Sequence, residues 1–157
     1  MKTGVSPLRW LKSTSNRTFI VWPAVLFAAE ALVQQGLPRI DPWFLPLLAW
    51  GYLQYVWVGT YRTRLGGGGP GLANPPDRIV EAGPYRWVRN PMYLGHLIFF
   101  AGLALVLHSW IAAAVFALHL VWFDRRVRSD ERHLAERFGE AYRDYCRRVK
   151  RWIPGVL

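Results

Sequence analysis

The sequence has 157 residues, of which 52% are hydrophobic, and its 20 lysines and arginines outnumber its 10 aspartates and glutamates. This length suits one domain, the apolar content excludes a disordered chain, and the single Cys146 excludes a disulfide scaffold or a zinc site built from several thiolates. A net charge of +10 is compatible with a nucleic-acid partner or an anionic membrane surface. The positions of the basic residues therefore have to decide between these two partners.

Four long apolar segments predict membrane-spanning helices. They cover residues 19–37, 43–61, 92–107 and 110–123, and Glu30 is their only charged residue. The first two approach the roughly 20 residues that a spanning helix needs. The last two are shorter and only His108 and Ser109 separate them, which predicts a tight helical hairpin. The alternative, a soluble bundle with buried helices, would leave too little polar chain to cover four such segments.

The basic residues alternate between the two sides that these spans would separate. The segments outside the apolar stretches hold 4, 1, 5, 0 and 10 lysines and arginines in chain order, and a glycine-rich linker lies at residues 66–71. Because such residues favour the cytoplasmic side, both termini are predicted to be cytoplasmic. The arginine-rich, lysine-poor composition indicates a prokaryotic inner membrane. Basic residues that flank apolar segments, without an aromatic-lined groove, argue against a nucleic-acid partner.

Polar residues within the apolar segments are few. Glu30 is costly there unless it is paired, and His96 and His119 are its candidate partners. Four scattered histidines without carboxylates at a metal-ligand spacing predict no metal site.

The last third of the chain predicts a cytoplasmic amphipathic helix. Ser129 is a candidate N-cap, and apolar residues recur at spacings of three and four from Leu134 to Val149. Two interpretations remain open for this helix. It either lies on anionic lipid headgroups or forms a lid over a cytoplasmic pocket.

The densest cluster of polar and aromatic residues is GPYRWVRNPMYLG, residues 83–95. Pro91 suits the first turn of a helix and Asn90 its N-cap. The free N–H groups of that turn, with Arg89, suit a carboxylate or phosphate, and the aromatic residues suit a flat ring. An aromatic belt at the membrane interface is the alternative.

This cluster, the hairpin and the pattern that runs from Asp130-Glu131 through Phe138-Gly139 to Val149 together resemble the isoprenylcysteine carboxyl methyltransferase superfamily, which includes membrane phospholipid N-methyltransferases. The resemblance covers residues 77–154. It implies a multi-span all-α enzyme that uses S-adenosyl-L-methionine, releases S-adenosyl-L-homocysteine and binds both at the cytoplasmic face.

The resemblance also implies roles for individual residues. Arg126 would bind the substrate, and Arg89, Arg126 and Glu131 would be catalytic. The family's eukaryotic members have His in place of Asp77 and Asn90 and Glu in place of Asp130, differences that concern the acceptor more than the cofactor. The implied cofactor contacts are Asp77, Arg78, Ile79, Val80, Tyr85, Asn90, Pro91, Met92, Tyr93, Gly95, Asp130 and Glu131.

We therefore predict an S-adenosylmethionine-dependent membrane methyltransferase. It forms one membrane-embedded domain over residues 1–157, with cytoplasmic cofactor segments at 77–91 and 124–154. Its acceptor is a lipid or small hydrophobic molecule that presents a carboxyl, amine or thiol group, and membrane lipids are its other partners. An NADPH-dependent membrane sterol-type reductase and a non-enzymatic membrane interaction protein are the alternatives.

Overall fold

The computed structural model describes residues 7–69 and 75–153. Within these residues, β-structure is limited to one isolated bridge between Val88 and Lys150, so the predicted all-α fold is confirmed. Part of the basic N-terminal segment, part of the glycine-rich linker and Pro154 lie outside the described residues.

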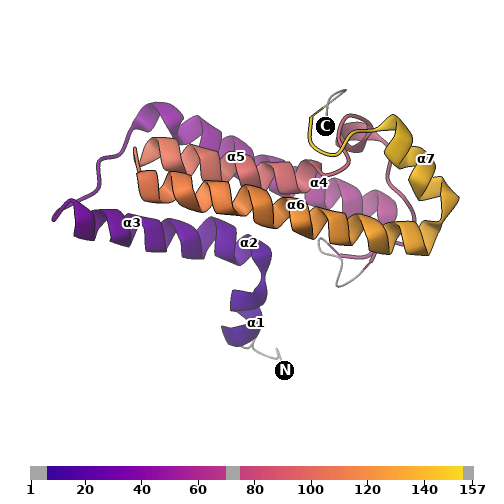
Figure 1. Ribbon diagram of the computed structural model, residues 1–157, viewed down its shortest axis with the longest axis horizontal. Coiled ribbons are helices and arrows are strands. Elements are labelled where there is room, and N and C mark those ends of the chain that lie inside the picture. Colours follow the sequence, from indigo (N-terminus) through magenta and orange to yellow (C-terminus); the bar gives the residue numbers. More distant parts are fainter. Residues whose placement is uncertain (1–6, 70–74, 154–157) are drawn as a thin grey trace. The chain divides into compact units, whose positions relative to one another are not determined.

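The helices follow the predicted apolar segments closely. The first comprises a π-helical turn η1 (Arg17–Val21) and α3 (Trp22–Val33), preceded by the short α1 (Pro7–Lys12) and α2 (Thr14–Asn16). The second is α4 (Leu45–Gly66), which follows a 3₁₀ turn η2 (Pro42–Phe44). After a second 3₁₀ turn, η3 (Gly83–Arg86), come α5 (Pro91–Val106), α6 (Trp110–Phe138) and α7 (Glu140–Arg148), as Figure 1 shows.

The predicted helix start at Ser129 is wrong. Helix α6 runs unbroken from Trp110 to Phe138, because residues 124–137 contain neither glycine nor proline to interrupt it. The break comes at Gly139, whose φ of +60° is unfavourable for residues with a side chain. The predicted amphipathic segment is thus the second half of α6 together with α7.

One helical stretch of the described chain, Thr14–Val33, is long and apolar enough to cross a membrane, and Pro91–Val106 is apolar but shorter. The other two predicted spans include or adjoin polar residues that lower their mean hydropathy. The count of four spans remains a prediction.

The chain divides into two compact units. Unit 1 consists of residues 7–52 and 96–117, and unit 2 consists of residues 53–69, 75–95 and 118–153. Helices α4, α5 and α6 each contribute a segment to both units.

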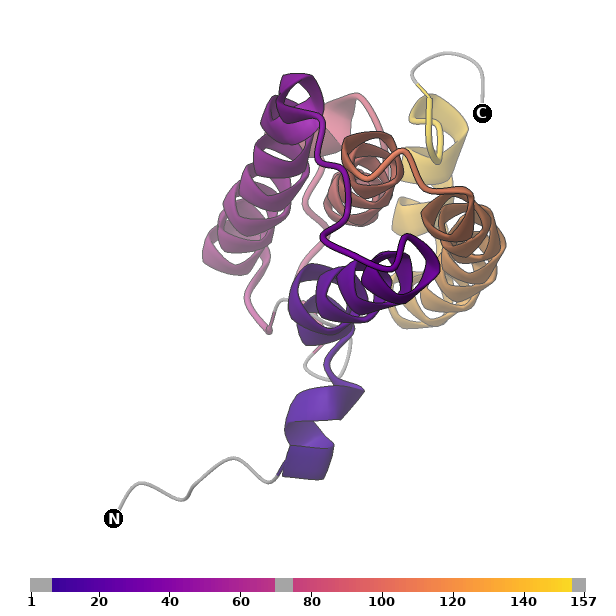
Figure 2. The ribbon, with the colours of Figure 1, turned by 90° about the vertical axis from the view of Figure 1, so that its left-hand side faces the viewer.

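The core of unit 1 is apolar and tightly packed. Leu26 of α3 packs with Phe99 and Leu103 of α5 and with residues of the hairpin, and the helical segments of this unit lie side by side in the end-on view of Figure 2. Gly102 permits a close approach, since a Cβ atom there would lie 3.1 Å from the backbone nitrogen of Leu48. Small residues at such contacts let two helix backbones come together.

Glu30 is buried in unit 1, and the structure gives it partners other than the expected histidines. The Ser109 hydroxyl donates to its Oε1, and Gln34 Nε2 donates to its Oε2 at 3.0 Å. Ser109 Oγ also accepts the backbone N–H of Ala112 at 2.9 Å, which caps the start of α6. The turn of the predicted hairpin therefore also satisfies the buried carboxylate.

Small apolar cores lie within unit 2. Val58 of α4 packs against Tyr85 and Met92. Tyr142 and Tyr145 of α7 pack back onto the last turns of α6, where Figure 1 shows α7 in yellow folding back from the end of α6. Both cores border the pocket described below.

Candidate functional site

Unit 2 contains a partly enclosed pocket with a free volume of about 70 Å³. Five segments line it: the end of α4, the loop before α5, the first turn of α5, the second half of α6, and α7. The lining residues are Arg62, Pro76, Arg78, Ile79, Val80, Tyr85, Arg89, Asn90, Met92, Tyr93, Asp130, Leu134, Phe138, Tyr142 and Tyr145.

A close contact between helix α4 and the following loop shapes one wall. A Cβ atom at Gly66 would lie 2.8 Å from Val80 Cγ2, so only glycine allows the loop to lie against the helix end. The Gly66 carbonyl accepts the backbone N–H of Asp77 at 2.7 Å. These contacts place Ile79 and Val80 along the pocket.

Aromatic side chains form much of the pocket surface. Tyr145 Oη donates to the Tyr85 carbonyl at 2.7 Å, which fixes α7 to the loop before α5. Burial raises the pKa of Tyr85 to about 12, against a smaller opposing effect of Arg62. Burial likewise raises the pKa values of Tyr142 and Tyr145. These hydroxyls therefore remain neutral at physiological pH and act as hydrogen-bonding groups.

Asp130 lies between the pocket and a neighbouring groove, whose lining is Pro75, Arg126, Ser129, Asp130, His133, Leu134, Glu136 and Arg137. The Tyr93 hydroxyl donates to Asp130 Oδ2 at 2.7 Å, and Arg126 Nε lies 3.3 Å from Oδ1. Asp130 and Leu134 line both the pocket and the groove, whereas Arg126 lines the groove and not the pocket. A carboxylate with a tyrosine on one side and an arginine on the other is therefore held at the boundary.

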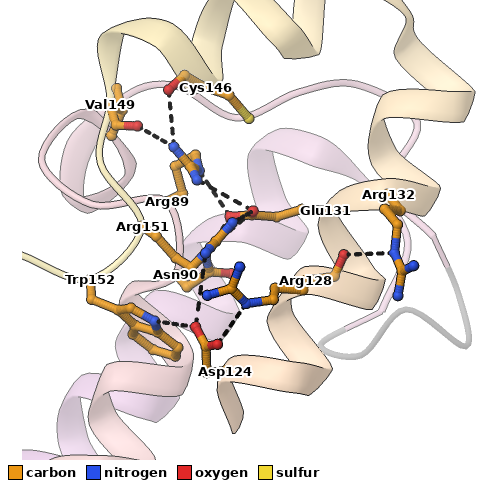
Figure 3. A network of polar contacts seen from close by, with 10 residues as sticks. All are labelled: Arg89, Asn90, Asp124, Arg128, Glu131, Arg132, Cys146, Val149, Arg151 and Trp152. Atoms are coloured by element: carbon orange, nitrogen blue, oxygen red, sulfur yellow. Dashed lines mark hydrogen bonds and ion pairs between the residues drawn. The ribbon is translucent and has the colours of Figure 1, made fainter. Parts of the chain in front are cut away.

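Glu131 is the centre of a buried ion-pair cluster (Figure 3). Arg89 Nε donates to its Oε1 at 2.9 Å, and Arg151 Nη2 donates to its Oε2 at 2.7 Å. Asn90 Nδ2 adds a third donor at 3.2 Å from Oε1. Although burial by itself raises the pKa of Glu131, the hydrogen bonds from Arg151 and Arg89 outweigh it and hold that pKa below its usual value.

Arg89 extends this cluster to the backbone after α7. Its Nη1 donates to the carbonyls of Cys146 at 3.0 Å and Val149 at 2.6 Å. Its own backbone N–H donates to the Lys150 carbonyl at 2.8 Å. Within unit 2, Arg89 and Glu131 thus tie the segment after α7 to the first turn of α5 and to α6.

Most of the predicted site residues come together, and some do not. Asp77 is exposed and lies 3.9 Å from Arg137, Pro91 and Gly95 are buried outside the lining, and Glu131 lies in the ion-pair cluster. Among the residues with a predicted catalytic role, only Arg89 lines the pocket, and most of its donors are engaged. The predicted cofactor residues that do line it are Arg78, Ile79, Val80, Tyr85, Asn90, Met92, Tyr93 and Asp130.

Sequence reasoning did not assign Arg62 to the site. It lies directly after the predicted span 43–61, in the last turns of α4, where a basic residue looks like an ordinary membrane-interface anchor. Its position four residues after Val58 and four before Gly66, on one face of α4, was the available signal. The apolar stripe that predicted the amphipathic segment was also informative, since Leu134, Phe138, Tyr142 and Tyr145 line the pocket, as the lid interpretation requires.

Comparison with known proteins connects this chain to methyltransferases. The phospholipid methyltransferase family model matches residues 52–141, more than half of the chain. Protein-S-isoprenylcysteine O-methyltransferases are also similar: that of Schizosaccharomyces pombe is 31% identical over 52% of this chain, form B of Arabidopsis thaliana 36% over 50%, and that of Mus musculus 37% over 50%.

The aligned parts cover only 35%, 41% and 28% of the lengths of these three relatives, so the likeness is confined to a part of each of them. The matched residues 52–141 include most of the pocket lining. The family match confirms the resemblance that the sequence motifs indicated. The chain belongs to the phospholipid methyltransferase family.

Proposed function

We propose that this chain is an S-adenosylmethionine-dependent membrane methyltransferase that acts on a lipid or other hydrophobic acceptor at the cytoplasmic face. The observation that carries the proposal is the pocket of unit 2, which is built almost entirely from the segments that match the family. The side chains that line it supply the chemistry that this methyl donor requires.

The residues of the pocket fit the donor. S-adenosylmethionine supplies an electrophilic methyl group on a sulfonium cation. Tyr85, Tyr93, Phe138, Tyr142 and Tyr145 offer aromatic faces, which attract cations and stack on flat rings. Asp130 offers a carboxylate for hydroxyl or ammonium groups, and Arg62 and Arg78 offer positive charge for a carboxylate.

The neighbouring groove is the proposed acceptor site. Arg126 is half-exposed there, and its guanidinium is suited to orient an acceptor carboxylate. Such an acceptor carries its own electron pair and needs alignment and no general base, so orientation is the main task of the side chains. Asp130, at the boundary, keeps Arg126 in place through their ion pair.

The relatives named above are called protein-S-isoprenylcysteine O-methyltransferases. We propose an acceptor of the same physical kind for this chain: a polar group, preferably a carboxylate, on a long apolar chain. Such a molecule would reach the groove from the bilayer, which accounts for an enzyme embedded in a membrane.

Large apolar side chains at the surface support the membrane location. Leu32, Trp43 and Trp110 are 80%, 86% and 89% exposed, which is costly in water and favourable in lipid. We propose the inner membrane of a prokaryote, with both termini in the cytoplasm, in agreement with the alternating basic charge.

Calorimetric titration of the full chain in detergent tests the proposal. S-adenosylhomocysteine should bind the wild type, bind Asp130→Asn about 10- to 100-fold more weakly through loss of charge-assisted hydrogen bonds, and bind Asp144→Asn normally, because Asp144 lies exposed on α7. Binding of NADPH in place of S-adenosylhomocysteine would replace the proposal with the reductase. Binding of neither ligand by folded protein would refute an enzymatic role.

The acceptor is then identified with labelled S-adenosylmethionine. Transfer of label to membrane lipids or to S-farnesylcysteine should require the wild-type Arg126. If Arg126→Gln methylates these acceptors as fast as the wild type, the groove is not the acceptor site.

A further inference from the structure

Arg62 stands out among the residues that line the pocket, because a polar atom of its side chain is buried without a partner. Its Nε has no hydrogen-bond acceptor among the residues that the structure describes. One of its Nη atoms donates to the carbonyl of Gly69, so that carbonyl does not serve Nε. A buried donor without an acceptor is unfavourable, and a charged one more so.

The other arginines of the pocket differ from Arg62. Arg89 is paired with Glu131 and two backbone carbonyls, and Arg78 is exposed to solvent. For Arg62, the part of the chain that the structure describes provides no carboxylate within ion-pair distance, although the chain provides one for Arg89. Arg62 is thus the partly buried cation of the pocket whose charge is not matched.

Packing holds Arg62 in this position. Val58, one turn earlier on the same face of α4, is completely buried against Tyr85 and Met92. Gly66, one turn later, lies against Val80 and the carbonyl of Arg78. These two contacts fix the face of α4 that carries Arg62 against the loop and the start of α5.

The chemistry of the guanidinium selects the ligand group. A guanidinium presents parallel N–H donors that match the two oxygens of a carboxylate better than any single-point acceptor. We propose that Arg62 recognises a carboxylate of a molecule bound in this pocket. This inference rests on the proposed function, under which the carboxylate belongs either to the amino-acid part of the methyl donor or to the acceptor.

Calorimetry with ligand pairs that differ only in a carboxylate tests the inference. The first pair is S-adenosylhomocysteine and its decarboxylated analogue, which keeps the ammonium group. The second pair is S-farnesylcysteine and its carboxamide, titrated into protein saturated with S-adenosylhomocysteine. The variants are Arg62→Gln and the control Arg64→Gln, which removes an exposed arginine from the same helix outside the pocket lining.

In the wild type and Arg64→Gln, the carboxylate member of one pair should bind about 10- to 100-fold more tightly than its partner. In Arg62→Gln this preference should fall to within a few-fold of unity. Loss of preference in the first pair assigns the carboxylate to the donor, and loss in the second pair assigns it to the acceptor.

Two results would overturn the inference. Arg62→Gln could keep the wild-type preference in both pairs, as expected if water satisfies Nε, or it could weaken both members of each pair equally, as expected for a purely structural role. These results are distinct from failure of the proposed function, in which the wild type itself would bind neither S-adenosylhomocysteine nor its decarboxylated analogue.

Discussion

Replacing Glu131 with glutamine is expected to loosen the segment that follows α7. The Glu131 carboxylate is almost buried and receives hydrogen bonds from Arg89 and Arg151. Glutamine keeps the volume and one acceptor oxygen but loses the charge. Among the described residues, this leaves Arg89 without a counter-ion and Arg151 with only Asp124, at 3.8 Å. Because Arg89 also holds the carbonyls of Cys146 and Val149, the loss should be felt along residues 140–153.

The magnitude follows from the burial of the cluster. The side chains of Arg89, Glu131 and Arg151 are 9%, 11% and 23% exposed, so solvent screens their charges only in part. Removing one partner of a buried ion pair costs about 3–5 kcal/mol, and the oxygen that glutamine retains favours the lower value. About 3 kcal/mol corresponds to a roughly 100-fold larger opening equilibrium for this segment.

Hydrogen–deuterium exchange of the detergent-solubilised full chain, read by mass spectrometry, measures this opening. Peptides from residues 140–153 should exchange about 100-fold faster in Glu131→Gln. The control Glu136→Gln removes an exposed charge from the same helix and should leave exchange unchanged. Wild-type protection of this segment in Glu131→Gln would refute the idea that the cluster holds it.

The pH dependence of the same experiment provides an independent check. The pKa of Glu131 is lower in the folded protein than its usual value, so its stabilising effect is complete above about pH 4.5 and is lost as the pH falls through the folded value. A protonated glutamate resembles glutamine. After correction for intrinsic exchange rates, the difference between wild type and Glu131→Gln should therefore shrink at acidic pH, and a constant difference would contradict this reasoning.

Two further predictions concern unit 1. Gly102→Ala should destabilise the protein by about 1–3 kcal/mol through overpacking, since the new methyl group would lie 3.1 Å from the backbone nitrogen of Leu48, whereas Gly36→Ala, at an exposed glycine, should be close to neutral in the same thermal unfolding experiment. Ser109→Ala should cost about 1–3 kcal/mol, because it removes a helix cap and a donor to the buried Glu30; an unchanged midpoint of unfolding would show that neither contact matters.

The sequence predicted those features that depend on neighbouring residues. Apolar segments of sufficient length gave the helices, and the pair His108-Ser109 gave the hairpin between α5 and α6. The residues from Gly83 to Gly95 indicated a site at the start of α5, and much of the pocket lies there. Where a local pattern was weak, prediction failed: Ser129 resembled a cap but nothing near it interrupts α6.

Features that join distant parts of the chain were not predictable in this way. Asp130 and Glu131 are adjacent and were expected to share a cofactor role. The helix turns them in different directions, so that Asp130 lines the pocket and Glu131 lies among arginines from two other segments. Successive residues of a helix point about 100° apart, and which of them faces a pocket depends on what the fold packs against each side.

The sequence by itself thus determined an all-α chain with long apolar helices, an alternating distribution of basic residues and the family to which its motifs belong, because each of these depends on composition, spacing or short motifs. The tertiary structure decided that Arg62 of α4 joins the pocket, that Glu131 anchors the segment after α7, and that Ser109 pairs with Glu30. The partners of Glu131 and Ser109 lie tens of residues away in the chain. Arg62 likewise lines the pocket together with residues that are tens of positions away from it in the sequence. Only packing brings such residues within hydrogen-bonding or pocket-lining distance.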